Sequence, residues 1–188
     1  MVDKKPGEEE KVGIEQKILN CNPVLEAFGN SKTVRNNNSS RFGKYVKLIF
    51  NLKNGEILGA QTLNYLLEKS RVCQPASKER NYHVFYHLLR GASEELLMSL
   101  GLSSPTGGRL DYQDFKYLKC GTDVDQKIVN DVELYEEIHE TFIALGFSEE
   151  ERNGIWRIVA ACLLLGEVEF DGSTYDENGK LLLFYTST

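Results

Sequence analysis

The side chains best suited to chemistry stand together in residues 36–44, which read NNNSSRFGK. Two adjacent hydroxyls, Ser39 and Ser40, are followed at once by the guanidinium of Arg41. One hydroxyl can ligate Mg²⁺ at about 2.1 Å, another can hydrogen-bond a phosphate oxygen, and an arginine can hold a carboxylate across a cleft. Stretches rich in Asn and Ser are usually simple turns, because their side chains satisfy local backbone groups. The arginine, and a glycine at Gly43 that permits close backbone approach, favour a phosphate–magnesium site.

Two other groupings favour structural roles. His83 and His87 have the i, i+4 spacing of a helical metal pair, but position 84 is valine, so the HExxH pattern of zinc proteases is missing. We therefore interpret both as core or surface histidines. Glu68 and Arg71 could contact other parts of a larger assembly, but a structural ion pair is the simpler role.

A β-hairpin is predicted to carry the candidate site. Residues 42–52 and 57–62 are rich in aromatic and β-branched residues, and Asn54-Gly55 between them is a tight-turn signal. Residues 64–69 either continue the second strand or open a helix. The polar residues 30–41 are interpreted as a loop that leads into the first strand.

A helix is predicted before this loop, from Ile14 onward. Asn22 followed by Pro23 resembles an N-cap with proline in the first turn, so the helix is expected to restart or kink there. Gly29 or Asn30 can supply a left-handed stop.

The remainder of the chain has a helical pattern. The long amphipathic helix is predicted from residues such as Tyr135, Ile138 and Phe142, and Ser148 with Glu151 forms a capping box for the last helix. Residues 155–165 are apolar on nearly every face, which is typical of a buried helix. The predicted helices cover residues 79–89, residues 94 to about 100 after a Ser93 cap, 111–118, 125–145 and 149–165.

Composition limits the possible functions. The chain has 188 residues, a net charge of −6 and 41 % hydrophobic residues, as in ordinary soluble domains. The absence of an overall positive charge argues against nucleic-acid binding. The longest apolar run, residues 158–165, is far shorter than the ~20 residues of a membrane span, so no membrane insertion is expected. Four scattered cysteines without a CxxC pair favour a reduced, cytosolic protein rather than a zinc or redox site.

Residues 36–44 resemble switch I of the myosin motor domain. A kinesin switch loop is related, but there Ser-His follows the arginine, whereas Phe42-Gly43-Lys44 follows here. The resemblance covers residues 14–175. Its further motifs are NPVLEAFGNSKTVR at residues 22–35, YLLEKSRV at 65–72, ERNYHVFYHLLRGAS at 79–93 and GFSEEERNGIWRIVAACLLLGEVEF at 146–170.

This resemblance implies roles for four residues. Asn36 would contact the nucleotide phosphates, and Ser39 would bond the γ-phosphate and help relay the proton of the lytic water. Ser40 would ligate Mg²⁺, and Arg41 would form a cleft-closing salt bridge with a glutamate of switch II. For the intact motor, the resemblance implies Mg²⁺ with ATP as the cofactor, ATP and actin filaments as partners, and a cytoplasmic, cytoskeleton-associated location.

Two loops that complete such a site are missing from the sequence. The phosphate-binding pattern GxxxxGK[ST] does not occur, and the Lys32-Thr33 pair lacks its paired glycines. Switch II would lie beyond residue 188. We therefore expect an internal fragment of a motor that, in isolation, does not hydrolyse ATP.

The expected fold is α/β and mostly helical, as part of a P-loop NTPase-type motor. A hairpin from the central sheet would be followed by the helical upper fifty-kilodalton subdomain. Residues 1–13 would be the charged, flexible remnant of a surface loop, residues 14–177 a partial motor domain, and residues 178–188 an atypical tail. Two alternatives stay open: a non-catalytic protein-interaction module derived from a motor, and a truncated product without function.

Overall fold

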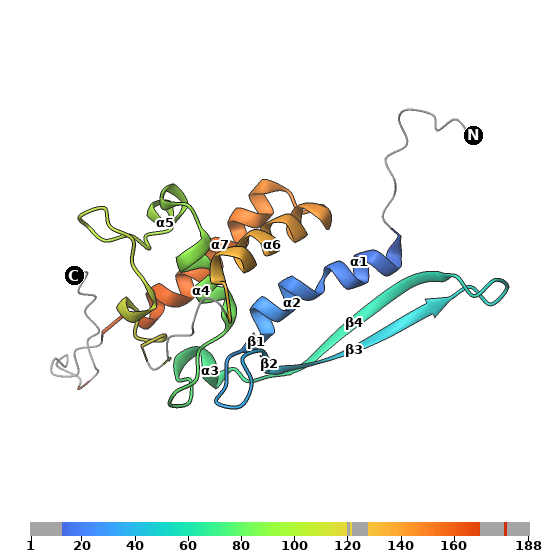
Figure 1. Cartoon of the computed structure of the whole chain (residues 1–188), viewed down its shortest axis with the longest axis horizontal. Helices are drawn as coiled ribbons and strands as arrows, with labels where there is room; N and C mark the ends of the chain where they lie inside the picture. Colours follow the sequence, from blue (N-terminus) through green and yellow to red (C-terminus); the bar gives the residue numbers. More distant parts are fainter. Residues whose placement is uncertain (1–12, 120, 122–127, 170–178, 180–188) are drawn as a thin grey trace.

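A computed structural model describes residues 13–119, 121, 128–169 and 179. The predicted segments 1–13 and 178–188 lie outside these residues, apart from Gly13 and Gly179. In chain order the elements are α1 (Ile14–Asn20), α2 (Asn22–Gly29), β1 (Asn30–Ser31), β2 (Ser39–Ser40), β3 (Phe42–Phe50), β4 (Ile57–Leu67), α3 (Ser70–Cys73), α4 (His83–Gly91), α5 (Glu94–Ser99), the 3₁₀ turn η1 (Tyr112–Asp114), α6 (Asp131–Ala144) and α7 (Glu149–Gly166). In Figure 1, a long β-hairpin extends away from a cluster of helices, and α1 and α2 run alongside it. The mixed, mostly helical fold is as predicted.

The N-terminal helix restarts at Asn22, as the sequence predicts. Cys21 rather than Asn22 holds the N-cap position, and Pro23 lies in the first turn of α2, where a missing N–H leaves no bond unmade. The predicted left-handed stop is wrong. Asn30 is extended, with φ −112° and ψ 159°, because the chain passes directly from α2 into strand β1.

The predicted loop at residues 30–41 contains a small hairpin of its own. β1 pairs with β2 in antiparallel register, with Asn30 opposite Ser40 and Ser31 opposite Ser39. Asn30, Ser31 and Thr33 are buried, whereas residues 34–38 are exposed at the tip. The polar segment therefore consists of buried residues near β1 and an exposed turn at residues 34–38.

The large hairpin is confirmed, with corrected ends. β3 stops at Phe50, two residues before the predicted end, because Asn51 N donates to Glu56 O (2.8 Å) and closes the turn there. Gly55 in this turn has φ +74°. β4 continues to Leu67 rather than Thr62, since its pairing with β3 extends to Phe42 opposite Leu67. Most of the hairpin's side chains are exposed.

The helix predicted at residues 79–89 begins four residues late, at His83. The preceding residues are extended instead: Arg80 N donates to Lys32 O (3.0 Å), and Tyr82 forms a β-bridge with Ser31. These long-range bonds compete successfully with local helix formation. α5 follows the predicted Ser93 cap, whose Oγ accepts from Leu96 N (3.2 Å).

The last helices need two corrections. The helix predicted at 111–118 is only the three-residue turn η1, which a capping box between Asp111 and Asp114 holds. α6 begins at Asp131 after an Asn130 cap, and residues 125–127 of its predicted start lie outside the described part of the chain. The predicted capping box at Ser148 is confirmed: Ser148 N donates to the Glu151 carboxylate (2.8 Å).

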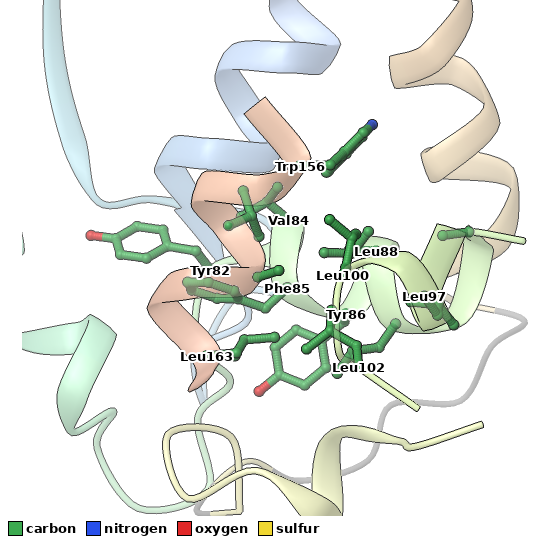
Figure 2. Packing of buried hydrophobic residues seen from close by; sticks show 14 of the residues in the cluster. Tyr82, Val84, Phe85, Tyr86, Leu88, Leu97, Leu100, Leu102, Trp156 and Leu163 are labelled. Carbon is green, nitrogen blue, oxygen red and sulfur yellow. The ribbon is translucent and has the colours of Figure 1, made fainter. Parts of the chain in front are cut away.

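The core surrounds α4, whose residues 83–89 are all buried (Figure 2). Trp156 and Leu163 of α7, and Ile138 and Phe142 of α6, pack against it. α7 was expected to be buried on every face, but Ile158 and Leu165 are each 67 % exposed. Only one side of α7, which includes Trp156, Val159 and Leu163, is buried by the rest of the described residues.

Candidate functional site

The predicted site residues lie where α2 ends and the long hairpin begins, around the short strands β1 and β2 (Figure 1). Asn36 is exposed in the tip between these strands, Ser39 and Ser40 form β2, and Arg41 links β2 to β3. The four residues named from the sequence therefore belong to one short stretch of backbone.

The backbone of this stretch is tied at both ends. Thr33 N donates to Asn36 O (2.8 Å) and closes the tip. Arg41 N donates to Gly29 O (2.8 Å), and Glu68 N donates to Arg41 O (3.0 Å). The backbone of Arg41 is thus held between the end of α2 and the end of β4.

Asparagine side chains brace the tip from within. Asn38 N donates to Asn36 Oδ1 (2.9 Å). The NH₂ group of the Asn36 side chain has no hydrogen-bond partner among the described residues. The amide of Asn38 donates to the Glu26 carboxylate and accepts from Asn30 Nδ2, both at 2.9 Å. Neither Asn38 nor Glu26 was singled out from the sequence, and no local pattern reveals their contact.

The two serine hydroxyls have opposite hydrogen-bond states. Arg41 Nη1 donates to Ser39 Oγ (3.2 Å), which leaves the Ser39 proton for an acceptor. Ser40 Oγ instead donates its proton to the carbonyl of Phe42 (3.0 Å), which leaves oxygen lone pairs outward for a cation. Ser40 is exposed and Ser39 is half-buried. The pair can therefore offer a donor to an anion and a ligand to a metal ion side by side.

A network of four alternating charges lies behind the loop. Arg41 Nε contacts Glu68 Oε2 (2.6 Å), and Arg71 Nε contacts the same oxygen (2.8 Å). Arg71 Nη2 also contacts Glu79 Oε2 (2.8 Å), and Arg71 Nη1 donates to the carbonyl of Arg80 (3.0 Å). Glu68 and Arg71 were each expected to form a structural ion pair, and they form one with each other. The contact with Arg41, 27 residues away in sequence, was not predicted.

These contacts shift the titration of both glutamates. Burial alone would raise the pKa of Glu68, but hydrogen bonds from Arg71 and Arg41 outweigh it, so the pKa lies below the ordinary value of 4.5. For Glu79, burial is likewise outweighed by bonds from Arg71 and from Val34 N, and its pKa is also lowered. Both carboxylates are therefore ionised at neutral pH.

A cavity of about 580 Å³ lies beside the loop, and its lining includes Asn37, Asn38, His83 and His87. The two imidazole rings are stacked, with centroids 5.7 Å apart. Burial, with a contribution from the charge of Arg80, lowers the pKa of His83 to about 3. Burial also lowers the pKa of His87 well below 6.5. Both histidines are therefore neutral core residues.

The described residues contain no group of three or more His, Cys, Asp or Glu side chains that could hold a metal ion. A magnesium ion at Ser40 would therefore need its other ligands from nucleotide, water or protein groups outside this set. Among the helices that the structure describes, none has the length and apolar character needed to cross a membrane.

Comparison with known proteins adds the family. The protein-family profile "Myosin head (motor domain)" matches residues 1–182. The chain is 46 % identical over 158 residues to "Myosin-I heavy chain" of Dictyostelium discoideum, covering 84 % of the chain and 6 % of that protein. It is 46 % identical over 156 residues to "Myosin-1" of Saccharomyces cerevisiae, covering 83 % and 8 %. For "Unconventional myosin IC" of Drosophila melanogaster the identity is 46 % over 158 residues, covering 84 % and 15 %.

The chain thus spans between 6 % and 15 % of the length of these three relatives. The match extends over most of the chain and includes the candidate loop, both strands of the long hairpin and the helical core. The chain belongs to the myosin head family.

Proposed function

We propose that this segment supplies switch I and the upper, actin-side subdomain of an ATP-dependent, actin-based cytoskeletal motor. Membership of the family supports the general role. The observation that carries the proposal for the loop is the opposite hydrogen-bond state of Ser39 and Ser40. A loop that must hold a phosphate and a metal ion together needs one hydroxyl of each kind.

In this proposal, Ser39 faces the γ-phosphate and the attacking water. Its oxygen accepts from Arg41, so its proton is directed to a substrate oxygen rather than to the protein. Asn36 contributes the NH₂ end of its amide to the phosphates, since its carbonyl oxygen is already bonded to Asn38 N. Arg41 forms the salt bridge to switch II that the family resemblance implies. Each group acts by position and charge, which is what phosphoryl transfer requires.

Ser40 fits a magnesium ligand by its chemistry. Its hydroxyl is exposed, and its proton is bonded to the Phe42 carbonyl, so the lone pairs are available to a hard cation. When bound, Mg²⁺ supplies positive charge that neutralises the phosphate oxygens.

The proposal includes the division of the chain. Residues 1–13 form a remnant of a surface loop, residues 14–177 a partial motor domain and residues 178–188 an atypical tail. The 188-residue chain alone does not hydrolyse ATP, because the GxxxxGK[ST] pattern is missing from its sequence.

The test compares two proteins. The 188-residue chain alone should release no phosphate from MgATP above the buffer rate. A longer heavy chain that carries this segment between its flanking motor sequences should release phosphate, and Ser39→Ala should reduce that rate by roughly 10²-fold, as expected for a lost transition-state donor. Steady hydrolysis by the short chain, abolished by Ser39→Ala, would contradict the proposed inactivity. An unchanged rate in the long Ser39→Ala variant would contradict the role of the loop.

A second candidate is a non-catalytic interaction module. The exposed apolar side chains of the long hairpin favour it, since such surfaces mark sites where proteins meet. A coding sequence with an in-frame GxxxxGKT segment upstream would decide for the motor. A chain that is expressed alone as a stable, cooperatively melting monomer would decide for the module.

A further inference from the structure

The carboxylate of Glu68 is the junction of the charge network behind the candidate loop. One of its oxygens accepts from both Arg41 Nε (2.6 Å) and Arg71 Nε (2.8 Å). Glu68 also holds Arg41 through the backbone, because its N–H donates to the Arg41 carbonyl (3.0 Å). Glu68 thus holds Arg41 twice: its carboxylate binds the guanidinium, and its N–H binds the backbone carbonyl.

Arg71 anchors this junction to the core. Its side chain is 2 % exposed, and it bonds Glu68, Glu79 and the carbonyl of Arg80. Two arginines and two glutamates alternate in the network, so no net charge is buried. Arg41 and Glu68 are the more exposed pair of the network, with side chains 29 % and 35 % exposed.

The network contacts the loop at two places. At one end Glu68 holds Arg41, and at the other Glu79 Oε1 accepts from Val34 N (3.3 Å). Val34 and Arg41 flank the stretch of chain that contains Asn36 and both serines. The network therefore connects the two ends of the loop to each other.

A β-bulge lies two residues before Glu68. Pairing shifts between Phe42 opposite Leu67 and Gly43 opposite Tyr65, so Leu66 is the extra residue, with φ +55°. A shift of one residue reverses the face on which each following side chain lies. Leu66 is 81 % exposed, so no core contact accounts for its strained backbone. The bulge lies two residues before Glu68, where it can re-aim that side chain toward Arg41.

We infer that Glu68 is a positioning residue for Ser39, acting through Arg41. Glu68 holds the guanidinium so that Nη1 donates to Ser39 Oγ, which reserves the serine proton for a substrate oxygen. This inference rests on the proposed role of Ser39 at the γ-phosphate. Without the carboxylate, Arg41 gains rotameric freedom and the Ser39 hydroxyl loses its fixed orientation.

The experiment is a double-mutant cycle in the longer heavy chain that carries this segment. Phosphate release is measured for Glu68→Gln, Arg41→Met and the double variant. We expect Glu68→Gln to lower kcat by tenfold or more with the KM for ATP within twofold of wild type. The double variant should be no slower than Arg41→Met alone, because both changes remove the same path to Ser39. Glu56→Gln, which changes an exposed carboxylate in the turn of the same hairpin, is the matched control and should match wild type.

Two outcomes would overturn the inference: a kcat for Glu68→Gln equal to that of Glu56→Gln, or additive losses in the cycle. Glu68→Asp, which keeps the charge, should recover part of the lost kcat. If Glu68→Gln fails to fold, as judged by circular dichroism, the cycle is run with Glu68→Asp and Arg41→Lys, and the same non-additivity is expected. Ser39→Ala separates the two proposals. A wild-type rate of phosphate release in Ser39→Ala would contradict the proposed role of the loop. A reduced rate in Ser39→Ala together with a wild-type rate in Glu68→Gln would contradict only the role of Glu68.

Discussion

At the scale of single residues, the protein prepares two neighbouring serines for opposite partners. Ser39 accepts from Arg41, and Ser40 donates to a backbone carbonyl. The two identical side chains thus differ in what they can bind, because each has a different hydrogen-bond partner. The arginine that orients Ser39 depends in turn on Glu68, whose ionisation its arginine neighbours favour.

The buried histidines give a prediction on pH at the same scale. The pKa of His83 falls from 6.5 to about 3 on folding, so the unfolded chain binds more protons throughout that interval. The free energy of unfolding should therefore decrease on acidification from pH 6.5, by about 1.4 kcal/mol per pH unit for this residue. The lowered pKa values of Glu68 and Glu79 add a further loss below pH 4.5.

Urea unfolding of the dilute chain between pH 7 and pH 4 measures this dependence. His83→Gln should flatten the slope by about one proton. A wild-type slope in the His83 variant would show that His83 is not the group responsible.

At the scale of elements, the site depends on an abrupt passage from helix to strand. α2 ends at Gly29 and β1 begins at the next residue. The same glycine accepts Arg41 N through its carbonyl, and its α-carbon faces the ring of Phe42. A Cβ at Gly29 would overlap that ring, so the absent side chain permits the close approach of α2 to β3.

Gly29→Ala should therefore destabilise the fold. We expect a loss of about 1–3 kcal/mol, typical of overpacking, with displacement of the candidate loop. Gly59→Ala is the matched control, because a Cβ there would meet only Ile49 Cδ1 at 4.0 Å, and its effect should stay within about 0.5 kcal/mol. Thermal unfolding of both variants measures the difference. Equal melting temperatures would contradict the steric account.

The sequence predicted those elements whose signals are local. Asn54-Gly55 marked the hairpin, and Ser148 with Glu151 marked the start of α7. The errors arose where distant residues override local preference. α4 begins late because Arg80 and Tyr82 pair with the chain near β1, about 50 residues earlier.

The same division holds within the candidate site. Asn36 to Arg41 could be identified because chemistry and spacing coincide in one stretch of sequence. Their supports could not, because Glu68 and Glu79 reach the loop only through the folded hairpin and the turn after it. The β-bulge at Leu66, which no sequence pattern marked, interrupts the pairing of β4 two residues before Glu68.

At the scale of the whole molecule, the long hairpin is incompletely covered. Tyr45, Ile49, Leu63 and Tyr65 lie on one face of β3 and β4 and are 49–59 % exposed. Ile158 and Leu165 of α7 are also exposed. Surfaces of this kind are normally covered in an assembled protein.

The isolated chain should therefore self-associate. We expect sedimentation velocity to show species larger than a monomer at micromolar concentration. Ile49→Lys with Leu63→Lys should shift the distribution toward monomer, because the charges oppose sheet-to-sheet contact. Gln61→Lys, at a position of β4 that is already polar and pairs with Lys47, should shift it less. A wild-type chain that sediments as one monomeric species would contradict this prediction and favour the self-sufficient module.

The measurement that tests the account most directly is the Mg²⁺ dependence of phosphate release by the longer heavy chain. Ser40→Ala should raise the Mg²⁺ concentration needed for half-maximal rate, because a lone-pair ligand is lost. Ser39→Ala should lower the maximal rate and leave that concentration unchanged, because only a donor to the phosphate is lost. Equal Mg²⁺ dependence in both variants, or a shift confined to Ser39→Ala, would contradict the division of roles between the two serines.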